Sequence, residues 1–194
     1  MSSIIRGGGT VSGFTVWLTG LPGAGKSTIA SRLRDELARK GRLVEILDGD
    51  VLRSSLSIGL GFSRADRDLQ VRRLGLIARL LSRNGVVAIV AAVSPYREAR
   101  AEVRAQQDAP FIEVFVDCAL DVVISRDPKG LYQRALRGEI ANFTGVSDPY
   151  EAPEPPDVVV HTDAETADAS TAIVLGALER LRLVERERVG QVAR

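Results

Sequence analysis

Residues 20–27, Gly-Leu-Pro-Gly-Ala-Gly-Lys-Ser, have the spacing of a phosphate-binding loop, with an apolar run before them and a helical pattern after them. The glycines let the backbone turn tightly, so that its N–H groups point at phosphate oxygens, and the helix adds the positive end of its dipole. We expect catalytic Lys26 to reach the β- and γ-phosphates and the Ser27 hydroxyl to bind Mg²⁺. The pattern predicts binding of ATP or GTP and transfer of the terminal phosphate. The residues expected to hold the nucleotide are Gly20, Gly23, Ala24, Gly25, Lys26, Ser27 and Thr28.

An acidic turn, Asp48-Gly49-Asp50, follows a second apolar run. In extended geometry the two carboxylates project to one side, at the end of a strand where such sheets bind ligands. They are suited to hold a Mg²⁺-bound water and to accept a proton from an attacking hydroxyl. We expect Asp50 to act as base or substrate ligand and Asp48 to support it. A turn followed by a helix N-cap is the alternative interpretation. Arg53, one helical turn later, faces the same region.

An aromatic side chain and several arginines come next. Phe62 lies in a polar loop with glycines, where a ring is suited to stack on a base, although a core role is equally open. Arg67, Arg72 and Arg73 offer paired donors to phosphate or sulfate. A solvated helix face is the alternative for any one of these arginines.

The elements that must position these residues alternate between strand and helix. Apolar runs predict strands at residues 14–19, 43–47, 86–93, 111–116 and 158–161. Helical spacing predicts helices at residues 27–40, 66–84 and 166–184. Strands separated by helices predict an α/β fold with a doubly wound, five-stranded parallel sheet.

The domain boundaries follow from composition. The three consecutive glycines near the start predict a flexible arm at residues 1–13, followed by one domain at residues 14–184 and a charged tail at residues 185–194. Within the domain, residues 127–156 lose periodicity and contain five prolines. A long irregular segment in a compact domain is usually functional, so we expect a lid there.

Composition narrows the function class. The 194 residues carry a net charge of +1, which gives no basic field for nucleic acid. No apolar run approaches the length of about 18 residues that a membrane span needs, and the N-terminus lacks the apolar region of a secretory signal. The single cysteine, Cys118, fits a reducing cytoplasm, and the single histidine, His161, argues against a His/Cys metal site. We expect structural roles for both and for Trp17, a cytoplasmic location, and a small-molecule partner.

Seven motifs in a fixed order make the sequence more specific: GLPGAGKST, LDGD-x-x-R, LGFS-x-x-DR, SPYR-x-x-R, RDPKGLY, FTG and PYE. In this order they resemble the adenylylsulfate kinase (APS kinase) family of P-loop kinases, over about residues 14–163. The resemblance implies a three-layer P-loop kinase fold, usually a homodimer. It also implies a reaction in which ATP, with Mg²⁺, phosphorylates the 3′-hydroxyl of adenosine 5′-phosphosulfate (APS) to give PAPS and ADP. This PAPS biosynthesis would serve sulfate assimilation or the sulfation of a metabolite.

The resemblance implies roles for individual residues on the acceptor side. Phe62 and Phe143 would sandwich the adenine of APS, and Arg53 and Arg67 would hold its phosphosulfate. The family's substrate-contacting asparagine corresponds to Gln70.

The resemblance implies four further roles. Lys129 and Leu131 would belong to the lid over the substrate, and Arg126 would lie near the ATP base. Ser94 matches a serine often described as a phosphorylated catalytic intermediate. A structural or binding role for Ser94 stays open, because P-loop kinases generally transfer phosphate in line.

The chain departs from the family pattern at the acceptor side. Leu69 and Gln70 replace a glutamate and the asparagine, and Val51 replaces a common asparagine. Gln70 keeps the amide but adds a methylene, which shifts a hydrogen bond by about 1 Å, and displacements of that size can be costly in rate.

Two alternatives to an APS kinase remain. One is a P-loop kinase of the same build that acts on another small nucleotide or hydroxylated acceptor, which Leu69 and Gln70 weakly favour. The other is a catalytically idle nucleotide-binding domain, against which the intact Lys26, Ser27 and acidic turn argue.

Overall fold

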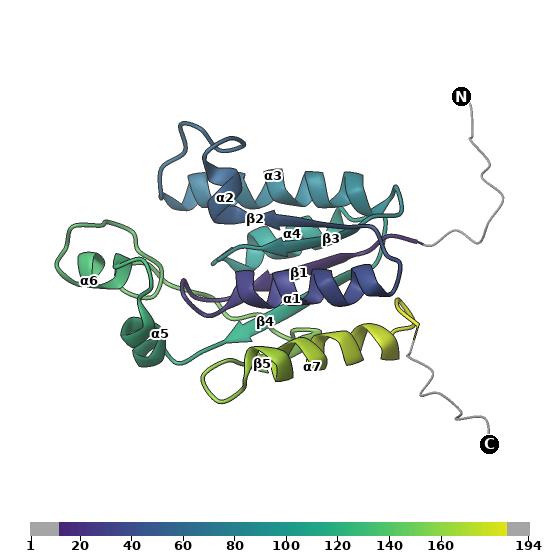
Figure 1. Cartoon of the computed structure of the whole chain (residues 1–194). Coiled ribbons are helices and arrows are strands. Elements are labelled where there is room, and N and C mark those ends of the chain that lie inside the picture. The colour runs from purple at the N-terminus through teal and green to yellow at the C-terminus, as the bar shows by residue number, and fades with distance from the viewer. Residues whose placement is uncertain (1–11, 186–194) are drawn as a thin grey trace, which may run out of the picture.

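The fold is built on one parallel sheet, seen in the computed structural model in Figure 1, which describes residues 12–185. Its strands are β1 (Thr15–Thr19), β2 (Val44–Asp48), β3 (Val87–Ala91), β4 (Phe111–Asp117) and β5 (Val158–His161). All neighbours pair in parallel in the order β2-β3-β1-β4-β5. The five-stranded parallel sheet predicted from the apolar runs is therefore confirmed.

Helices connect the strands. They are α1 (Lys26–Arg39), α2 (Gly49–Arg53), α3 (Arg64–Ser82), α4 (Arg97–Ala105), α5 (Leu120–Arg126), α6 (Leu131–Leu136) and α7 (Ala167–Arg180). The three long ones match the predicted helices, whereas α2, α4, α5 and α6 were not predicted. α2, α5 and α6 are seven residues or shorter, which leaves too few turns for a 3.6-residue period to emerge. α4 is nine residues long, but its buried residues include Arg100 beside Ala99 and Val103, so apolar residues alone do not mark its inner face.

Two cores lie on the two faces of the sheet and make the predicted three layers. On one face Val16 and Leu18 of β1 join the side chains of α1 and α7, including Leu33 and Leu178. On the other face Trp17 packs with side chains from α3 and α4. Successive strand residues point to opposite faces, so β1 is buried on both sides, as an apolar central strand requires. Figure 1 shows α1 and α7 together on one side of the sheet and α3 on the other.

Local chemistry sets the helix ends. α3 begins at Arg64, two residues before the predicted start, because the Ser63 hydroxyl caps it by accepting a hydrogen bond from the Asp66 N–H at 3.2 Å. α7 ends at Arg180 and not at residue 184, and Arg182 has a positive φ of 58° that no helix accommodates.

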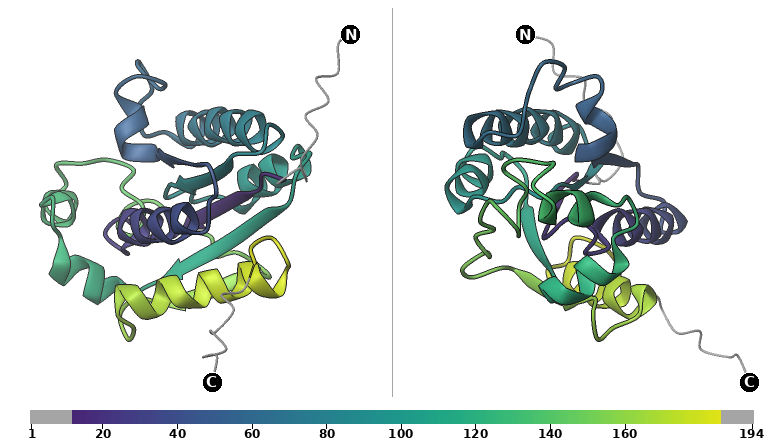
Figure 2. Two further views of the ribbon diagram at one scale, coloured as in Figure 1. Left: turned by 45° about the vertical axis from the view of Figure 1, so that its right-hand side comes forward. Right: turned by 90° about the vertical axis from the view of Figure 1, so that its left-hand side faces the viewer.

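The predicted lid region, residues 127–156, contains α6 and a turn closed by a bridge between Thr144 and Asp148. Figure 2 shows α5 and α6 standing out from the sheet on the side where the strands end. Most of the expected arm and tail lies outside the described residues. Of the helices within residues 12–185, none combines the length and apolar character that a membrane crossing requires.

Candidate active site

A cavity of about 530 Å³ lies at the carboxyl ends of the strands. The loops after β1, β2 and β3 contribute to its wall together with α3 and the segment around α6. Ligands of open α/β sheets bind at this edge. The predicted site residues that line the cavity are Gly23, Gly25, Lys26, Ser27, Thr28, Asp48, Asp50, Arg53, Phe62, Arg67, Gln70, Ser94, Lys129, Leu131 and Phe143.

The phosphate loop has the backbone that its glycines predict. Gly25 precedes α1 with a left-handed φ of 96°, which disfavours any other residue there. A Cβ on Gly20 would lie 2.3 Å from the Val116 carbonyl oxygen, so only glycine fits between β1 and β4. Lys26 is the first residue of α1, so the helix N-terminus opens into the cavity.

Lys26 is buried, with 8% of its surface exposed. Its Nζ donates hydrogen bonds to the carbonyls of Gly20 at 2.9 Å and Leu21 at 2.7 Å. Burial lowers the pKa of Lys26 to about 8, although Asp50 and Asp48 raise it. The ammonium is held by neutral carbonyls and not by a carboxylate, so it remains a strong site for an incoming phosphate.

Ser27 and Asp48 meet from two different elements. The Ser27 hydroxyl donates to Asp48 Oδ2 at 2.6 Å. A hydroxyl and a carboxylate are the hard oxygen ligands that Mg²⁺ prefers, and this ion usually takes its remaining ligands from water and phosphate. The described residues contain no group of three His, Cys, Asp or Glu side chains that could form an all-protein metal cage. The pair therefore fits a magnesium ion bound together with a nucleotide.

The acidic turn differs from its predicted shape. The expectation that it stays extended through Asp50 is wrong, because residues from Gly49 onward form α2. Asp48 Oδ1 caps this helix by accepting from the N–H groups of Asp50 at 2.9 Å and Val51 at 3.3 Å. Asp48 thus combines both interpretations that the sequence left open: one oxygen caps a helix and the other faces the phosphate loop.

Asp50 lies in the first turn of α2 and pairs with Lys129 from the lid region, at 2.7 Å between Oδ2 and Nζ. Both side chains are largely exposed. The hydrogen bond to Asp50 raises the pKa of Lys129, which favours the charged ammonium.

Two arginines surround Phe62. The guanidinium carbon of Arg53 lies 4.2 Å from the ring centroid and that of Arg67 lies 5.5 Å away. Gln70 connects Arg53 to the start of α2. Its Oε1 accepts from Arg53 Nη1 at 2.5 Å, and its Nε2 donates to the Gly49 carbonyl at 2.7 Å. Two neighbouring cations beside an exposed ring make a site for an anion attached to a flat base.

Phe143 forms the buried aromatic wall of the cavity. Its ring meets Tyr132 edge-on, with centroids 4.9 Å apart. The Tyr132 hydroxyl donates to the Pro22 carbonyl at 2.9 Å, which connects this wall to the phosphate loop. The predicted aromatic pair, Phe62 and Phe143, therefore lines one cavity, with Phe62 half exposed and Phe143 only 8% exposed.

Ser94 lines the cavity but is only 3% exposed. Trp17 Nε1 donates to its Oγ at 3.1 Å, and Oγ lies 3.0 Å from Thr19 Oγ1. Its φ of 39° is unusual for a residue other than glycine. A hydroxyl committed to two buried partners favours the structural alternative for Ser94 over the catalytic one.

Three predicted nucleotide-binding residues do not line the cavity: Gly20, Ala24 and Arg126. Arg126 donates instead to the Thr162 carbonyl at 2.6 Å, and the Thr162 hydroxyl donates to the Ala24 carbonyl at 2.8 Å. Arg126 is thus connected to the phosphate loop through Thr162 and lies outside the cavity lining.

One buried polar residue to which the sequence assigned no role, Arg100, supports the site. Arg100, only 2% exposed, donates to Glu113 Oε1 at 2.7 Å, to the Ser94 carbonyl at 2.6 Å and to the Glu151 carbonyl at 2.7 Å. The motif SPYR-x-x-R contained it, but only the structure gives its partners.

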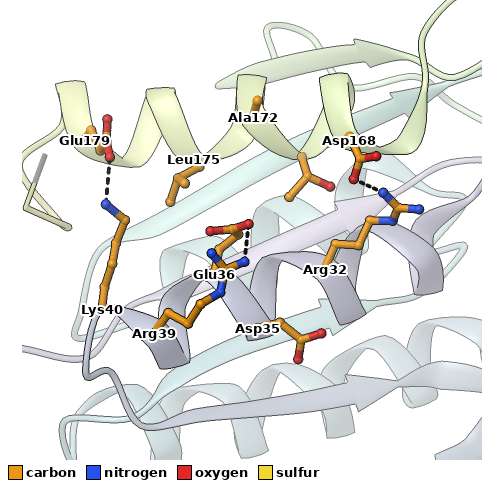
Figure 3. A pocket seen from close by; sticks show the side chains of 10 residues that line it. Arg32, Asp35, Glu36, Arg39, Lys40, Asp168, Ala172, Leu175 and Glu179 are labelled. Carbon is orange, nitrogen blue, oxygen red and sulfur yellow. Dashed lines mark hydrogen bonds and ion pairs between the residues drawn. The ribbon is translucent and has the colours of Figure 1, made fainter. Parts of the chain in front are cut away.

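A second cavity, of about 710 Å³, lies between α1 and α7 and contains none of the predicted site residues (Figure 3). Ion pairs cross it from Arg32 to Asp168 and from Lys40 to Glu179. Its charges therefore satisfy one another and connect two helices of one layer.

Comparison with known proteins agrees with this geometry. The family model described as adenylylsulphate kinase matches residues 12–161. The adenylyl-sulfate kinase of Myxococcus xanthus is 54% identical over 180 residues, which is 91% of this chain and 97% of the relative. The probable bifunctional SAT/APS kinase 2 of Sorangium cellulosum is 54% identical over 176 residues and 91% of this chain, but the chain spans only 30% of that protein's length. The solved APS kinase of Mycobacterium tuberculosis in complex with AMPPNP and APS superposes with a TM-score of 0.83 at 43% identity, covering 87% of this chain and 98% of that one. The chain belongs to the adenylylsulphate kinase family.

Proposed function

We propose that this cavity carries out the reaction of the family, in which ATP phosphorylates the 3′-hydroxyl of APS to give PAPS and ADP. One observation carries the proposal. A phosphate loop with a buried lysine and a wall of two phenylalanines and two arginines open into the same 530 Å³ space. A triphosphate and a planar, anionic acceptor can therefore meet there.

The phosphate loop holds the donor. Lys26 exchanges the carbonyls of Gly20 and Leu21 for the β- and γ-phosphates, while Gly23, Gly25 and Thr28 offer backbone N–H groups. Ser27, with Asp48 beside it, would hold Mg²⁺, which when bound neutralises charge on the phosphates. Arg126 does not line the cavity but is bonded to Thr162 beside the phosphate loop, from where it would lie near the ATP base.

Asp50 acts on the acceptor hydroxyl. Its carboxylate is positioned by α2 and accepts the proton as the 3′-oxygen attacks the γ-phosphorus. The new O–P bond forms as the bond to the β–γ bridging oxygen breaks, and ADP leaves. Lys129 balances the charge of Asp50 and approaches the transferring group from the lid region.

The opposite wall holds the acceptor. Phe62 and Phe143 stack on the adenine, and Arg53 and Arg67 bind the phosphosulfate. Arg53 and Arg67 both lie over Phe62 in the structure, so the base takes a part of the ring that neither covers or displaces a guanidinium. Residues 127–156, including Leu131, form the lid over this acceptor.

A kinase acting on another small nucleotide or hydroxylated acceptor is the second candidate. Gln70 favours it, because both ends of its amide are already bonded within the chain, which leaves one N–H and one lone pair for a substrate.

The experiment is direct: incubate the protein with Mg-ATP and APS, and quantify PAPS and ADP by chromatography. We expect equal amounts of both products, and a loss of about 100-fold in Lys26→Met, with circular dichroism checking that this variant is folded. No turnover of APS by a protein that binds ATP normally overturns the proposal. Turnover of AMP or of a sugar acid under the same conditions supports the second candidate.

We also propose a homodimer and a cytoplasmic location. Leu69, Leu76 and Leu80 share one face of α3 and are each at least 38% exposed, which suits a contact with a second copy. Light scattering tests this, with Leu76→Glu expected to give monomers. A hexamer, as in the APS kinase of Thiobacillus denitrificans, contradicts it.

The buried free thiol of Cys118 supports the proposed cytoplasmic location, because the cytoplasm is a reducing compartment. Fractionation of the native host tests this location.

A further inference from the structure

The turn that carries Phe143, residues 142–148, is held together by its own backbone. The N–H groups of Val146, Ser147 and Asp148 all donate to the Phe143 carbonyl, at 3.0, 3.0 and 3.1 Å. The Gly145 N–H donates to the Asp148 carbonyl at 2.8 Å. The turn is therefore a compact unit, and anything that holds Asp148 also holds Phe143.

Two side chains from other elements hold this turn. Arg67, on α3, donates from Nη2 to the Asn142 carbonyl at 2.5 Å, and its Nε lies 3.8 Å from Asp148 Oδ2. The hydroxyl of Tyr96, at the start of α4, donates to the same oxygen of Asp148 at 2.5 Å. The Asp148 carboxylate thus lies between a tyrosine and an arginine assigned to the acceptor.

Tyr96 is suited to hold a carboxylate permanently. It is 2% exposed, and its ring packs under the guanidinium of Arg64 at 4.5 Å. Burial, together with the hydrogen bond to Asp148, raises the pKa of Tyr96 to about 12. The hydroxyl keeps its proton at any physiological pH and donates it to Asp148.

We propose that Tyr96 and Asp148 are positioning residues for the acceptor. The pair locks the Phe143 turn against α3, so that the ring of Phe143 and the guanidinium of Arg67 keep one relative geometry. The inference rests on the proposed function, because it assumes that Phe143 and Arg67 contact APS. It adds two residues to which no role in the reaction was assigned.

Tyr96→Phe tests the pair, because it removes one oxygen and keeps the ring. We expect the KM for APS to rise about three- to tenfold, since a hydrogen bond to a charged group is lost, while the KM for ATP stays within about twofold. Tyr150→Phe is the matched control: it also removes a tyrosine hydroxyl, which is bonded to Thr19 at 2.9 Å and not to the turn. The control should leave the KM for APS unchanged.

A double-mutant cycle separates positioning from general stability. Tyr96→Phe added to Asp148→Ala should raise the KM for APS no further than Asp148→Ala alone, because the hydroxyl acts only through the carboxylate. Additive effects, or an unchanged KM for APS in Tyr96→Phe, overturn the inference. If Tyr96→Phe fails to fold, Asp148→Asn carries the same test, because it removes the charge that Arg67 faces. A parent protein that turns over no APS refutes the proposed function instead, and so distinguishes the two failures.

Discussion

Lys129 Nζ lies 2.7 Å from Asp50 Oδ2, so an ion pair joins the lid region to the carboxylate that we assign as the base. The side chains are 60% and 72% exposed. A pair this exposed contributes no more than about 1 kcal/mol to folding, so its significance lies in the reaction.

Lys129→Met should therefore separate activity from stability. We expect the melting temperature to stay within about 3 °C, because so little stability is lost. We expect kcat/KM for APS to fall about tenfold to hundredfold, because a cation beside the reacting groups is gone. Arg137→Met is the control, since Arg137 pairs with Glu139 in the same region, is similarly exposed and does not line the cavity. Equal losses in both variants contradict the prediction.

The affinity for ATP should depend on the charge of Lys26. Burial lowers the pKa of Lys26 to about 8 in the free protein, and a bound triphosphate favours the charged form. Binding should be independent of pH below about 8 and weaken by up to tenfold per unit above it, until the pKa of the complex is passed. Calorimetry between pH 7 and pH 9.5 measures this, with proton uptake on binding above pH 8. An affinity that rises with pH contradicts the prediction.

The same shift has the opposite sign for folding without ligand. Between the lowered pKa and the unfolded value of 10.5, the unfolded chain binds more protons than the folded protein. Burying the charged Lys26 ammonium costs folding free energy. This cost is absent above pH 10.5, where the lysine is neutral in both states, and it appears in full as the pH falls to about 8. Chemical denaturation across this window measures it: the free energy of unfolding of the parent should rise with pH relative to that of Lys26→Met.

Gln70→Asn should impair the acceptor side alone. An amide that is one methylene shorter cannot span Arg53 and the Gly49 carbonyl, so Arg53 loses its orientation. We expect the KM for APS to rise about three- to tenfold with an unchanged KM for ATP, as for the loss of one hydrogen bond to a charged group. Gln107→Asn is the control, because that amide bonds Gly75 and Val103 outside the cavity. An unchanged KM for APS in Gln70→Asn shows that Arg53 needs no such support.

Ser94→Ala tests the role of the buried hydroxyl. Because Oγ is bonded to Trp17 and Thr19, its loss should cost about 1 kcal/mol in stability and leave kcat within about fivefold. Protein incubated with γ-labelled ATP should carry no label on Ser94. Loss of turnover in a folded Ser94→Ala protein, or a labelled serine, restores the catalytic interpretation.

Much of the fold and of the donor side is local in the sequence and was predictable from it. The apolar runs gave the five strands, because a central parallel strand is buried on both faces and needs no alternation. The phosphate loop was equally predictable, since glycine itself permits the positive φ values that the loop requires. The short helix α2 was missed, because five residues are too few to show a helical period. The acidic turn was therefore predicted to be extended, whereas it continues into a helix.

The sequence by itself determined the residue types of the site: a phosphate loop with Lys26 and Ser27, an acidic turn, and the aromatic and basic residues of the other wall. Only the tertiary structure decided their partners. It brought Lys129 to Asp50 across 79 residues, Tyr96 to Asp148 across 52, and buried the Ser94 hydroxyl beside Trp17 across 77. Backbone conformation responds to neighbours a few residues away, so motifs reveal it. Hydrogen bonds between side chains depend on which loops meet at the edge of the sheet. The strand order decides which loops meet, and it is established only when the whole chain has packed.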